Sequence, residues 1–134
     1  MQPTTRATGT IEVRTYVPTP YDEPGEGPSL VRIHVEETFA GDVTGAGVVD
    51  FLQVLPADGS ASFVGVERVT ASIAGRTGTF VLQDAGTLAD GQVTGTWFVV
   101  PGSGTGDLSG LRGEGGFTAA VGQHATIHLD YWFE

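Results

Sequence analysis

The chain of 134 residues has the length of one globular domain, and its hydrophobic content of 40% is too high for a disordered chain. Its 16 acidic and 6 basic residues give a formal net charge of −10, which disfavours nucleic acid and anionic membrane surfaces as partners. There is no cysteine, no run of about 18 apolar residues and no N-terminal signal pattern, so disulfides, membrane spans and secretion are not expected. We therefore expect one acidic, cytoplasmic domain over residues 1–134.

Short alternating runs separated by turn residues predict an all-β chain, because glycine or proline interrupts each long window that could form a helix. The predicted strands, in chain order, are Ala7–Val17, Leu30–Phe39, Val43–Leu55, Ser60–Ile73, Thr77–Leu88, Gln92–Val100, Gly113–Val121 and Thr126–Phe133. The short joints make neighbouring strands antiparallel. Eight such strands leave exposed edges unless the sheet closes, which favours an eight-stranded antiparallel barrel over a two-sheet sandwich.

Two segments are predicted to be loops at the barrel ends. Residues Pro18–Pro28 contain four prolines and three acidic residues, a composition typical of an irregular loop. Residues Pro101–Leu111 are rich in glycine and serine and are expected to close the barrel, with one helical turn over Gly106–Leu111. This second loop is a poor phosphate loop, because no lysine or long helix follows it.

Hairpin registers predict a pair of acidic side chains inside the barrel. A two-residue turn at Gly75–Arg76 aligns the apolar faces of the flanking strands and places Glu67 opposite Asp84 on that face. A turn at Asp90–Gly91 then places Trp97 opposite Asp84. We therefore expect Glu67, Asp84 and Trp97 in one row across three strands.

The preceding hairpin admits two registers. A three-residue loop at Ala57–Gly59 places Val49 opposite Glu67, whereas a two-residue turn brings Asp50 to that position. We favour the three-residue loop, because its last residue is a glycine that suits the left-handed position.

The second predicted strand has two faces, and each is a candidate for the barrel interior. One face is mainly apolar and the other is polar, and a ligand-binding barrel can have a polar interior. The apolar face consists of Val31, Ile33, Val35, Glu37 and Phe39, and the polar face of Leu30, Arg32, His34, Glu36 and Thr38.

An apolar wall is predicted to line the interior. The last two strands share an apolar face that matches Phe117 with Tyr131 and directs the phenol of Tyr131 inward. The predicted substrate-binding residues are Phe51, Phe63, Phe80, Trp97, Phe117 and Tyr131. Four strand glycines on inward faces are expected to leave open volume for a ligand, namely Gly47, Gly65, Gly86 and Gly95.

The two acidic residues are the candidate catalytic groups. Desolvation and mutual repulsion on an apolar face raise the pKa of at least one carboxyl, so Glu67 and Asp84 form a potential acid and base pair. The alternative is that each carboxyl is simply hydrogen-bonded to backbone or to arginine. No metal or cofactor is expected, because His34, His124 and His128 lack the spacing of metal ligands.

Three segments carry a family resemblance that covers nearly the whole chain. GVERV, GRTGTFVLQ and VVPGSGTGDLSGLRGEGGF, in this order and spacing, resemble a bacterial family of unassigned function with an allene oxide cyclase-like barrel. The resemblance implies a closed antiparallel barrel with an internal cavity, a fold that is also similar to the lipocalin barrel. The family motif places a carboxylate at Glu67, and it usually has histidine after FVLQ, where this chain has Asp84.

By analogy, related barrels such as plant allene oxide cyclase and bacterial polyketide cyclases imply a function. They suggest a cofactor-independent cyclase or isomerase that holds an apolar, natural-product-like substrate. The alternatives are a non-catalytic carrier or sensor of a small molecule, and a structural protein with a filled core. Outward-facing Val64, Val66, Phe98 and Val100 are a candidate patch for a homodimer.

Overall fold

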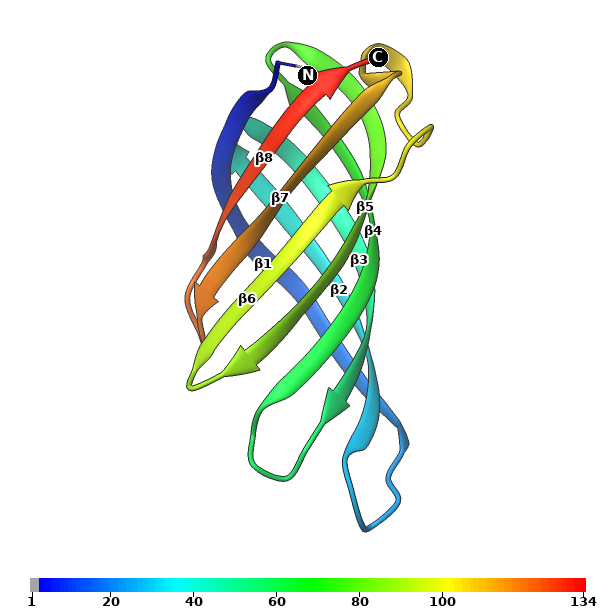
Figure 1. Ribbon diagram of the computed structural model, residues 1–134, viewed down its shortest axis with the longest axis vertical. Coiled ribbons are helices and arrows are strands. Elements are labelled where there is room, and N and C mark those ends of the chain that lie inside the picture. The colour runs from blue at the N-terminus through cyan, green and yellow to red at the C-terminus, as the bar shows by residue number, and fades with distance from the viewer. Residues whose placement is uncertain (1–2) are drawn as a thin grey trace.

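Eight antiparallel strands form a closed barrel in sequence order in the computed structural model, which describes residues 3–134 (Figure 1). The strands are β1 (Thr5–Asp22), β2 (Ser29–Gly41), β3 (Val43–Leu55), β4 (Ala61–Ile73), β5 (Arg76–Ala89), β6 (Gln92–Val99), β7 (Leu111–Ala120) and β8 (Ala125–Phe133). A short 3₁₀ turn, η1 (Gly106–Leu108), lies between β6 and β7. The prediction of an all-β barrel is confirmed, and the sandwich is wrong.

The predicted loop Pro18–Pro28 is wrong over its first half. β1 continues through Pro18 and Pro20, which pair with Ile33 and Val31 of β2. Beyond Ile11, β1 has no partner on its other side, since its pairing with β8 ends there. Proline lacks an N–H group and is tolerated in such an edge strand, so the prolines interrupt no ladder.

The two ends of the barrel differ, and we call them the open end and the closed end. The β1–β2 and β3–β4 hairpins extend past the other strands at the open end, whereas both termini and the β6–β7 loop lie at the closed end (Figure 1). Leu108 of η1 is fully buried in the core, and the amide of Thr105 donates to the carbonyl of Thr79 at 2.8 Å. The β6–β7 loop therefore closes this end as predicted, although its helical turn stops at Leu108.

Two apolar clusters fill the interior. The larger one occupies the closed-end part of the barrel and includes Phe39, Val69, Leu82 and Trp97. The smaller one lies toward the open end on β2 and β3 and consists of Val31, Ile33, Val35 and Val49, with Phe51 packed against it. The apolar face of β2 therefore points inward, and the alternative with Arg32, His34 and Glu36 inside is wrong.

The β4–β5 turn falls one residue earlier than predicted. Ala74 and Gly75 form it with φ values of 51° and 80°, so both residues adopt the left-handed conformation of a type I′ turn. The register moves by two residues, and Glu67 lies opposite Leu82 while Asp84 lies opposite Gly65. A shift of two residues keeps every side chain on its face, so both carboxyls still point inward.

Two of the other predicted registers are confirmed. Asp84 lies opposite Trp97 across the Asp90–Gly91 turn, and Val49 lies opposite Glu67 across the β3–β4 hairpin. The predicted match in the last hairpin is wrong, because Phe117 pairs with Ile127 while Tyr131 pairs with Gly113.

Candidate active site

Three buried carboxyls lie at the boundary between the two apolar clusters. Glu37 of β2, Glu67 of β4 and Asp84 of β5 are 8%, 1% and 4% exposed. Toward the open end, Glu67 is the next inward residue after Val69 on β4, and Asp84 is the next after Leu82 on β5; Val69 and Leu82 belong to the larger cluster. On β2, Glu37 separates Val35 of the smaller cluster from Phe39 of the larger one. We call these three side chains the carboxyl belt. Glu37 was not predicted as a site residue, although it sits in an apolar column as Glu67 does.

Glycines on the facing strands make room for two of the carboxyls. A Cβ atom at Gly47 of β3 would overlap Oε2 of Glu67, so the Glu67 carboxyl lies over this glycine. A Cβ at Gly65 of β4 would stand 2.7 Å from Oδ1 of Asp84. Any larger residue at either position would displace a carboxyl, because real Cβ atoms do not approach other atoms this closely.

The remaining inward glycines accommodate aromatic rings. Cβ atoms at Gly86 and Gly95 would collide with the rings of Phe63 and Phe117. The volume that the four glycines were expected to leave open is therefore filled by the protein's own rings and carboxyls. The internal cavity expected from the resemblance is accordingly not confirmed.

Two oxygens of the belt are unpartnered. Glu67 forms a side-chain hydrogen bond with Glu37, across β3. Oε2 of Glu67 and Oδ1 of Asp84 are buried and have no hydrogen-bond partner among residues 3–134. A buried polar atom without a partner lowers the stability of the fold by about 1–3 kcal/mol. Two such atoms in a small domain therefore indicate a functional site rather than a stabilising feature.

Burial raises the pKa of all three carboxyls, and neighbouring charges raise the pKa of Glu67 and Asp84 further. Burial is the main cause for Glu67, whose pKa lies well above its ordinary value, and the hydrogen bond with Glu37 and the charges of Glu37 and Asp84 raise it further. Burial also raises the pKa of Glu37, although the hydrogen bond with Glu67 opposes this. The pKa of Asp84 rises to about 7, again through burial first and then through the charge of Glu37. The hydrogen bond raises the pKa of Glu67 and lowers that of Glu37, so Glu67 is the donor of this pair, while Asp84 with a pKa of about 7 is close to half ionised at neutral pH.

A row of aromatic rings crosses the interior on the open-end side of the carboxyl belt. The ring centroids of Phe51 and Phe63 are 5.2 Å apart, those of Phe63 and Phe117 are 6.2 Å apart, and those of Phe117 and Trp97 are 5.1 Å apart. The three phenylalanines face inward yet are only half-buried, so solvent reaches them from the open end.

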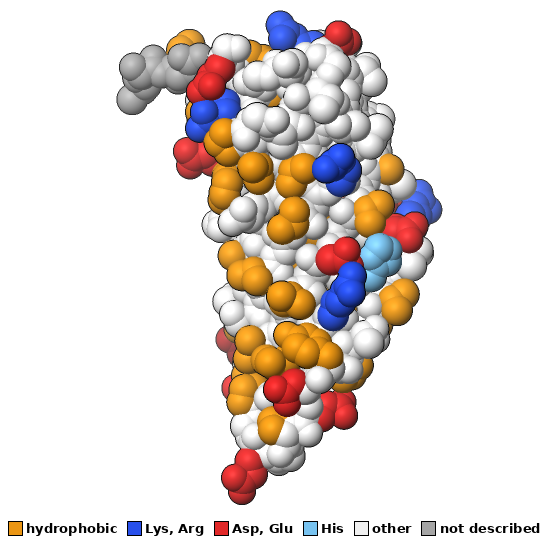
Figure 2. Space-filling view, turned by 90° about the vertical axis from the view of Figure 1, so that its right-hand side faces the viewer, with side chains coloured by type: hydrophobic (Ala, Val, Ile, Leu, Met, Phe, Trp, Pro, Cys, Tyr) orange, Lys and Arg blue, Asp and Glu red, His pale blue; other side chains and the backbone are white. Residues whose placement is uncertain are grey.

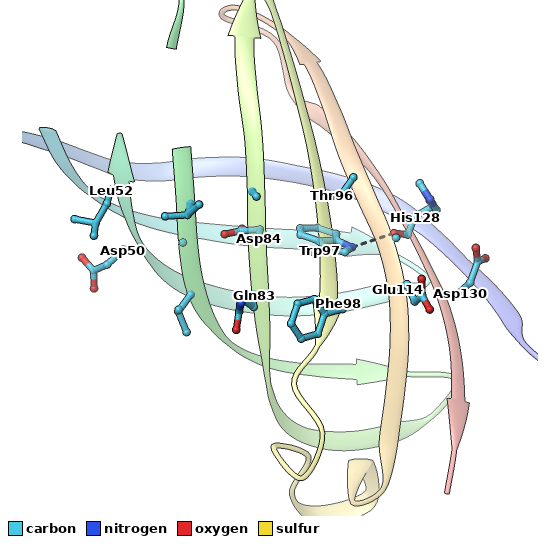
Figure 3. A pocket seen from close by; sticks show the side chains of 15 residues that line it. Asp50, Leu52, Gln83, Asp84, Thr96, Trp97, Phe98, Glu114, His128 and Asp130 are labelled. Carbon is cyan, nitrogen blue, oxygen red and sulfur yellow. Dashed lines mark hydrogen bonds between the residues drawn. The ribbon is translucent and has the colours of Figure 1, made fainter. Parts of the chain in front are cut away.

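The row ends with Trp97 beside Asp84. These two side chains lie on neighbouring strands (Figure 3). The indole nitrogen of Trp97 donates to the carbonyl of His128 at 3.2 Å, so its N–H is already used. Trp97 therefore offers Asp84 an apolar ring face and no hydrogen bond.

Two predicted wall residues lie elsewhere. Phe80 is 1% exposed and Tyr131 is 9% exposed, and both belong to the larger apolar cluster. They are on the closed-end side of the belt, so the structure does not bring them to the open end with the phenylalanine row.

Metal ligation is not supported by the geometry of the described part of the chain. Within residues 3–134, no three His, Asp or Glu side chains are arranged to hold one metal ion. His34 lies on the outer surface, 3.0 Å from Asp50 and 3.2 Å from Glu36. The hydrogen bond with Asp50 is the main cause that raises the pKa of His34, and the hydrogen bond with Glu36 raises it further. The same residues contain no helix that is long and apolar enough to cross a membrane.

The chemistry that the arrangement of the carboxyl belt favours is proton transfer.

Comparisons with known proteins identify a family and one solved relative. A family model described as "Protein of unknown function (DUF3224)" matches residues 7–131. A crystal structure of a protein with unknown function from the DUF3224 family of Shewanella oneidensis MR-1 is 30% identical. It covers 98% of each chain with a TM-score of 0.80. No curated protein matches the chain.

Proposed function

We propose that this chain, which belongs to the DUF3224 family of proteins of unknown function, is a cofactor-independent cyclase or isomerase that transfers protons within one apolar molecule. We also propose the likeness to allene oxide cyclase and polyketide cyclase barrels on which this choice of enzyme class rests. The carboxyl belt and the aromatic row support it, since they combine a proton donor, a proton acceptor and an apolar wall in one interior.

The observation that carries the proposal is the pair of unpartnered oxygens. Oε2 of Glu67 and Oδ1 of Asp84 are buried among apolar residues, where an ion or polar group without a partner is costly. Such strain is retained where the group acts on another molecule, and perturbed carboxyls in apolar sites are typical of acid and base catalysts. A purely structural interior would use apolar side chains at these positions.

A substrate would reach the belt from the open end. Its apolar part would displace the half-buried rings of Phe51, Phe63 and Phe117 from the space above the glycines, and its reacting part would lie between Glu67 and Asp84. Binding in this way would hold a flexible molecule in one conformation, which lowers the entropy cost of ring closure.

The three carboxyls divide the proton transfer. Asp84 with a pKa of about 7 is available as a carboxylate at neutral pH and accepts a proton from the substrate. The Glu67–Glu37 pair holds a proton and returns it at a second position of the substrate. Asp84 then passes its proton back to the pair, so each cycle leaves the enzyme unchanged and the product has the mass of the substrate. A reaction of this kind requires no cofactor.

The test is a search for products of unchanged mass. The purified protein is incubated with a small-molecule extract of its host, and liquid chromatography with mass spectrometry follows each compound. We expect one compound to decrease while another of identical mass and different retention time increases. The Glu67→Gln variant should reduce this conversion by about 100-fold or more, the range of general acid–base contributions. The matched control Glu114→Gln, an exposed carboxyl on the outside of β7, should convert normally.

The same experiment addresses the carrier or sensor alternative. A carrier would deplete a compound from the free pool and release it unchanged when the protein is denatured. Conversion that Glu67→Gln leaves at the wild-type rate would contradict the role of the carboxyl belt.

A further inference from the structure

The outside of the barrel carries a contiguous apolar patch. Leu52, Val64, Val66 and Phe98 are 52%, 54%, 56% and 42% exposed. Leu52 pairs with Val64, which pairs with Ala85 of β5, and Val66 and Phe98 both pair with Gln83. The apolar side chains therefore span β3 to β6, with the polar Gln83 among them. Hydrophobic side chains gather along the side of the barrel shown in Figure 2. We call the outward side chains of these four strands the apolar outer face.

This face is hollowed. A depression of about 850 Å³ is lined chiefly by outward-facing residues of β3 to β8, including Val64, Val66 and Phe98. The apolar outer face is therefore not uniformly convex.

Charged side chains flank the apolar centre on both sides. On β2 and β3, Arg32 and His34 lie 3.5 and 3.0 Å from Asp50. Arg68 of β4 lies next to Val66 on the outward side and has no charged partner among residues 3–134. Glu114 of β7 lies beyond Phe98 on the other flank.

The charges of this region balance, although the chain as a whole is strongly acidic. On the outward side of β2 to β7, three arginines are matched by three carboxylates: Arg32, Arg68 and Arg112, with Glu36, Asp50 and Glu114. A chain with a formal net charge of −10 repels a second copy of itself over most of its surface. A face whose charges balance lessens that repulsion, so it suits contact between two copies better than the acidic remainder of the surface does.

We propose that the apolar outer face is the interface of a homodimer. In a two-fold dimer whose axis runs along β4 and β5, the β2 flank of one copy meets the β7 flank of its partner. Arg32 and His34 then approach Glu114 of the partner. The apolar centres cover each other, with Val66 and Gln83 nearest the axis.

The size of the face suits this arrangement. Strands in a barrel tilt by about 35–45° from its axis, so a two-fold axis along the strands makes the two barrels cross at roughly 70–90°. The apolar outer face and its flanking strands β2 and β7 make six strands. At about 4.8 Å per strand and about 3.4 Å per residue over about eight residues, they span about 800 Å², which is the area that each partner buries in a standard stable interface.

The first test is the mass of the full chain in solution, measured by sedimentation equilibrium. We expect the wild type to have twice the monomer mass and Val66→Glu to have the monomer mass, because the new carboxylates meet near the two-fold axis. Val121→Glu changes a valine that is 63% exposed in the β7–β8 turn and should remain dimeric. A monomeric wild type, or a Val66→Glu variant that still dimerises, would overturn the proposal.

A second test does not depend on a destabilising change. The chain has no cysteine, so Gln83→Cys introduces a single thiol beside the proposed axis. Mild oxidation should link most of this variant into a disulfide dimer, whereas Val121→Cys should stay largely unlinked at the same concentration. Equal linking of the two variants would refute the interface. Neither outcome bears on the proposed chemistry, since the side chains of Val66 and Gln83 point outward while those of the carboxyl belt point inward.

Discussion

The Asp84→Asn variant tests the electrostatics of the carboxyl belt directly. An aspartate in an unfolded chain has a pKa near 3.9, whereas Asp84 in the folded protein has a pKa of about 7. Between these values the folded protein retains a proton that the unfolded chain has lost. The free energy of unfolding therefore falls as the pH rises, by up to about 1.4 kcal/mol per pH unit, and the fall ends above pH 7.

Between pH 5 and pH 8, Asp84 should remove about 2–3 kcal/mol of stability from the wild type. Asparagine has the same shape and does not ionise, so the variant lacks this loss. Its own packing and hydrogen-bond costs are the same at each pH. The quantity to follow is therefore the difference in unfolding free energy between variant and wild type, which should shift by about 2–3 kcal/mol in favour of asparagine over this range.

Urea denaturation at four pH values measures this difference. The control is Glu26→Gln, an exposed carboxyl in the β1–β2 loop outside the proposed interface, whose difference from wild type should stay constant. A constant difference for Asp84→Asn as well would refute the reasoning, because it would mean that Asp84 is ionised over the whole range. Carbon NMR of the Asp84 carboxyl gives an independent answer, and a titration midpoint below pH 5 would refute it too.

Two further predictions concern glycine niches and turns. Gly47→Ala should lower the free energy of unfolding in urea by about 1–3 kcal/mol, because its methyl group overlaps the Glu67 carboxyl, and the loss should shrink in a Glu67→Ala background. An equal loss in both backgrounds would contradict the niche. Ala74→Asn should raise the melting temperature, since Asn tolerates the φ of 51° better, and Asp90→Ala at the equivalent position of the next turn should lower it. A lower melting temperature for Ala74→Asn together with a higher one for Asp90→Ala would contradict the left-handed conformation of these two residues.

The sequence predicts the barrel well because its main signals are local. Alternating hydrophobicity and turn residues fix which segments are strands and which side chains point inward, and both are properties of a few neighbouring residues. Glu67, Asp84 and Trp97 were therefore correctly placed inside. The partner of Glu67 was wrong because the β4–β5 turn begins at Ala74, and an alanine at positive φ gives little sign of a type I′ turn.

Long-range features were harder to predict. The pattern of β2 does not predict the role of Glu37, although this residue interrupts an apolar column, because its contact with Glu67 crosses a third strand at Gly47. Inward glycines predict open space, but side chains from neighbouring strands fill it. Pro18 did not signal a strand, since its position at a free edge depends on where β8 stops pairing.

The carboxyl belt also divides the barrel into two parts that need not unfold together. Apolar contacts transmit cooperativity, and the belt interrupts them between the cluster at the closed end and the cluster of Val31, Ile33, Val35 and Val49. When Asp84 ionises, the hydration it gains favours opening of the strands nearest the open end. Backbone amides of that half should then exchange hydrogen faster than expected from base catalysis alone as the pH passes 7, while amides around Phe80 keep their protection. The fold would in this way couple the ionisation of its interior to the opening of the barrel end that we propose as the entrance for a substrate.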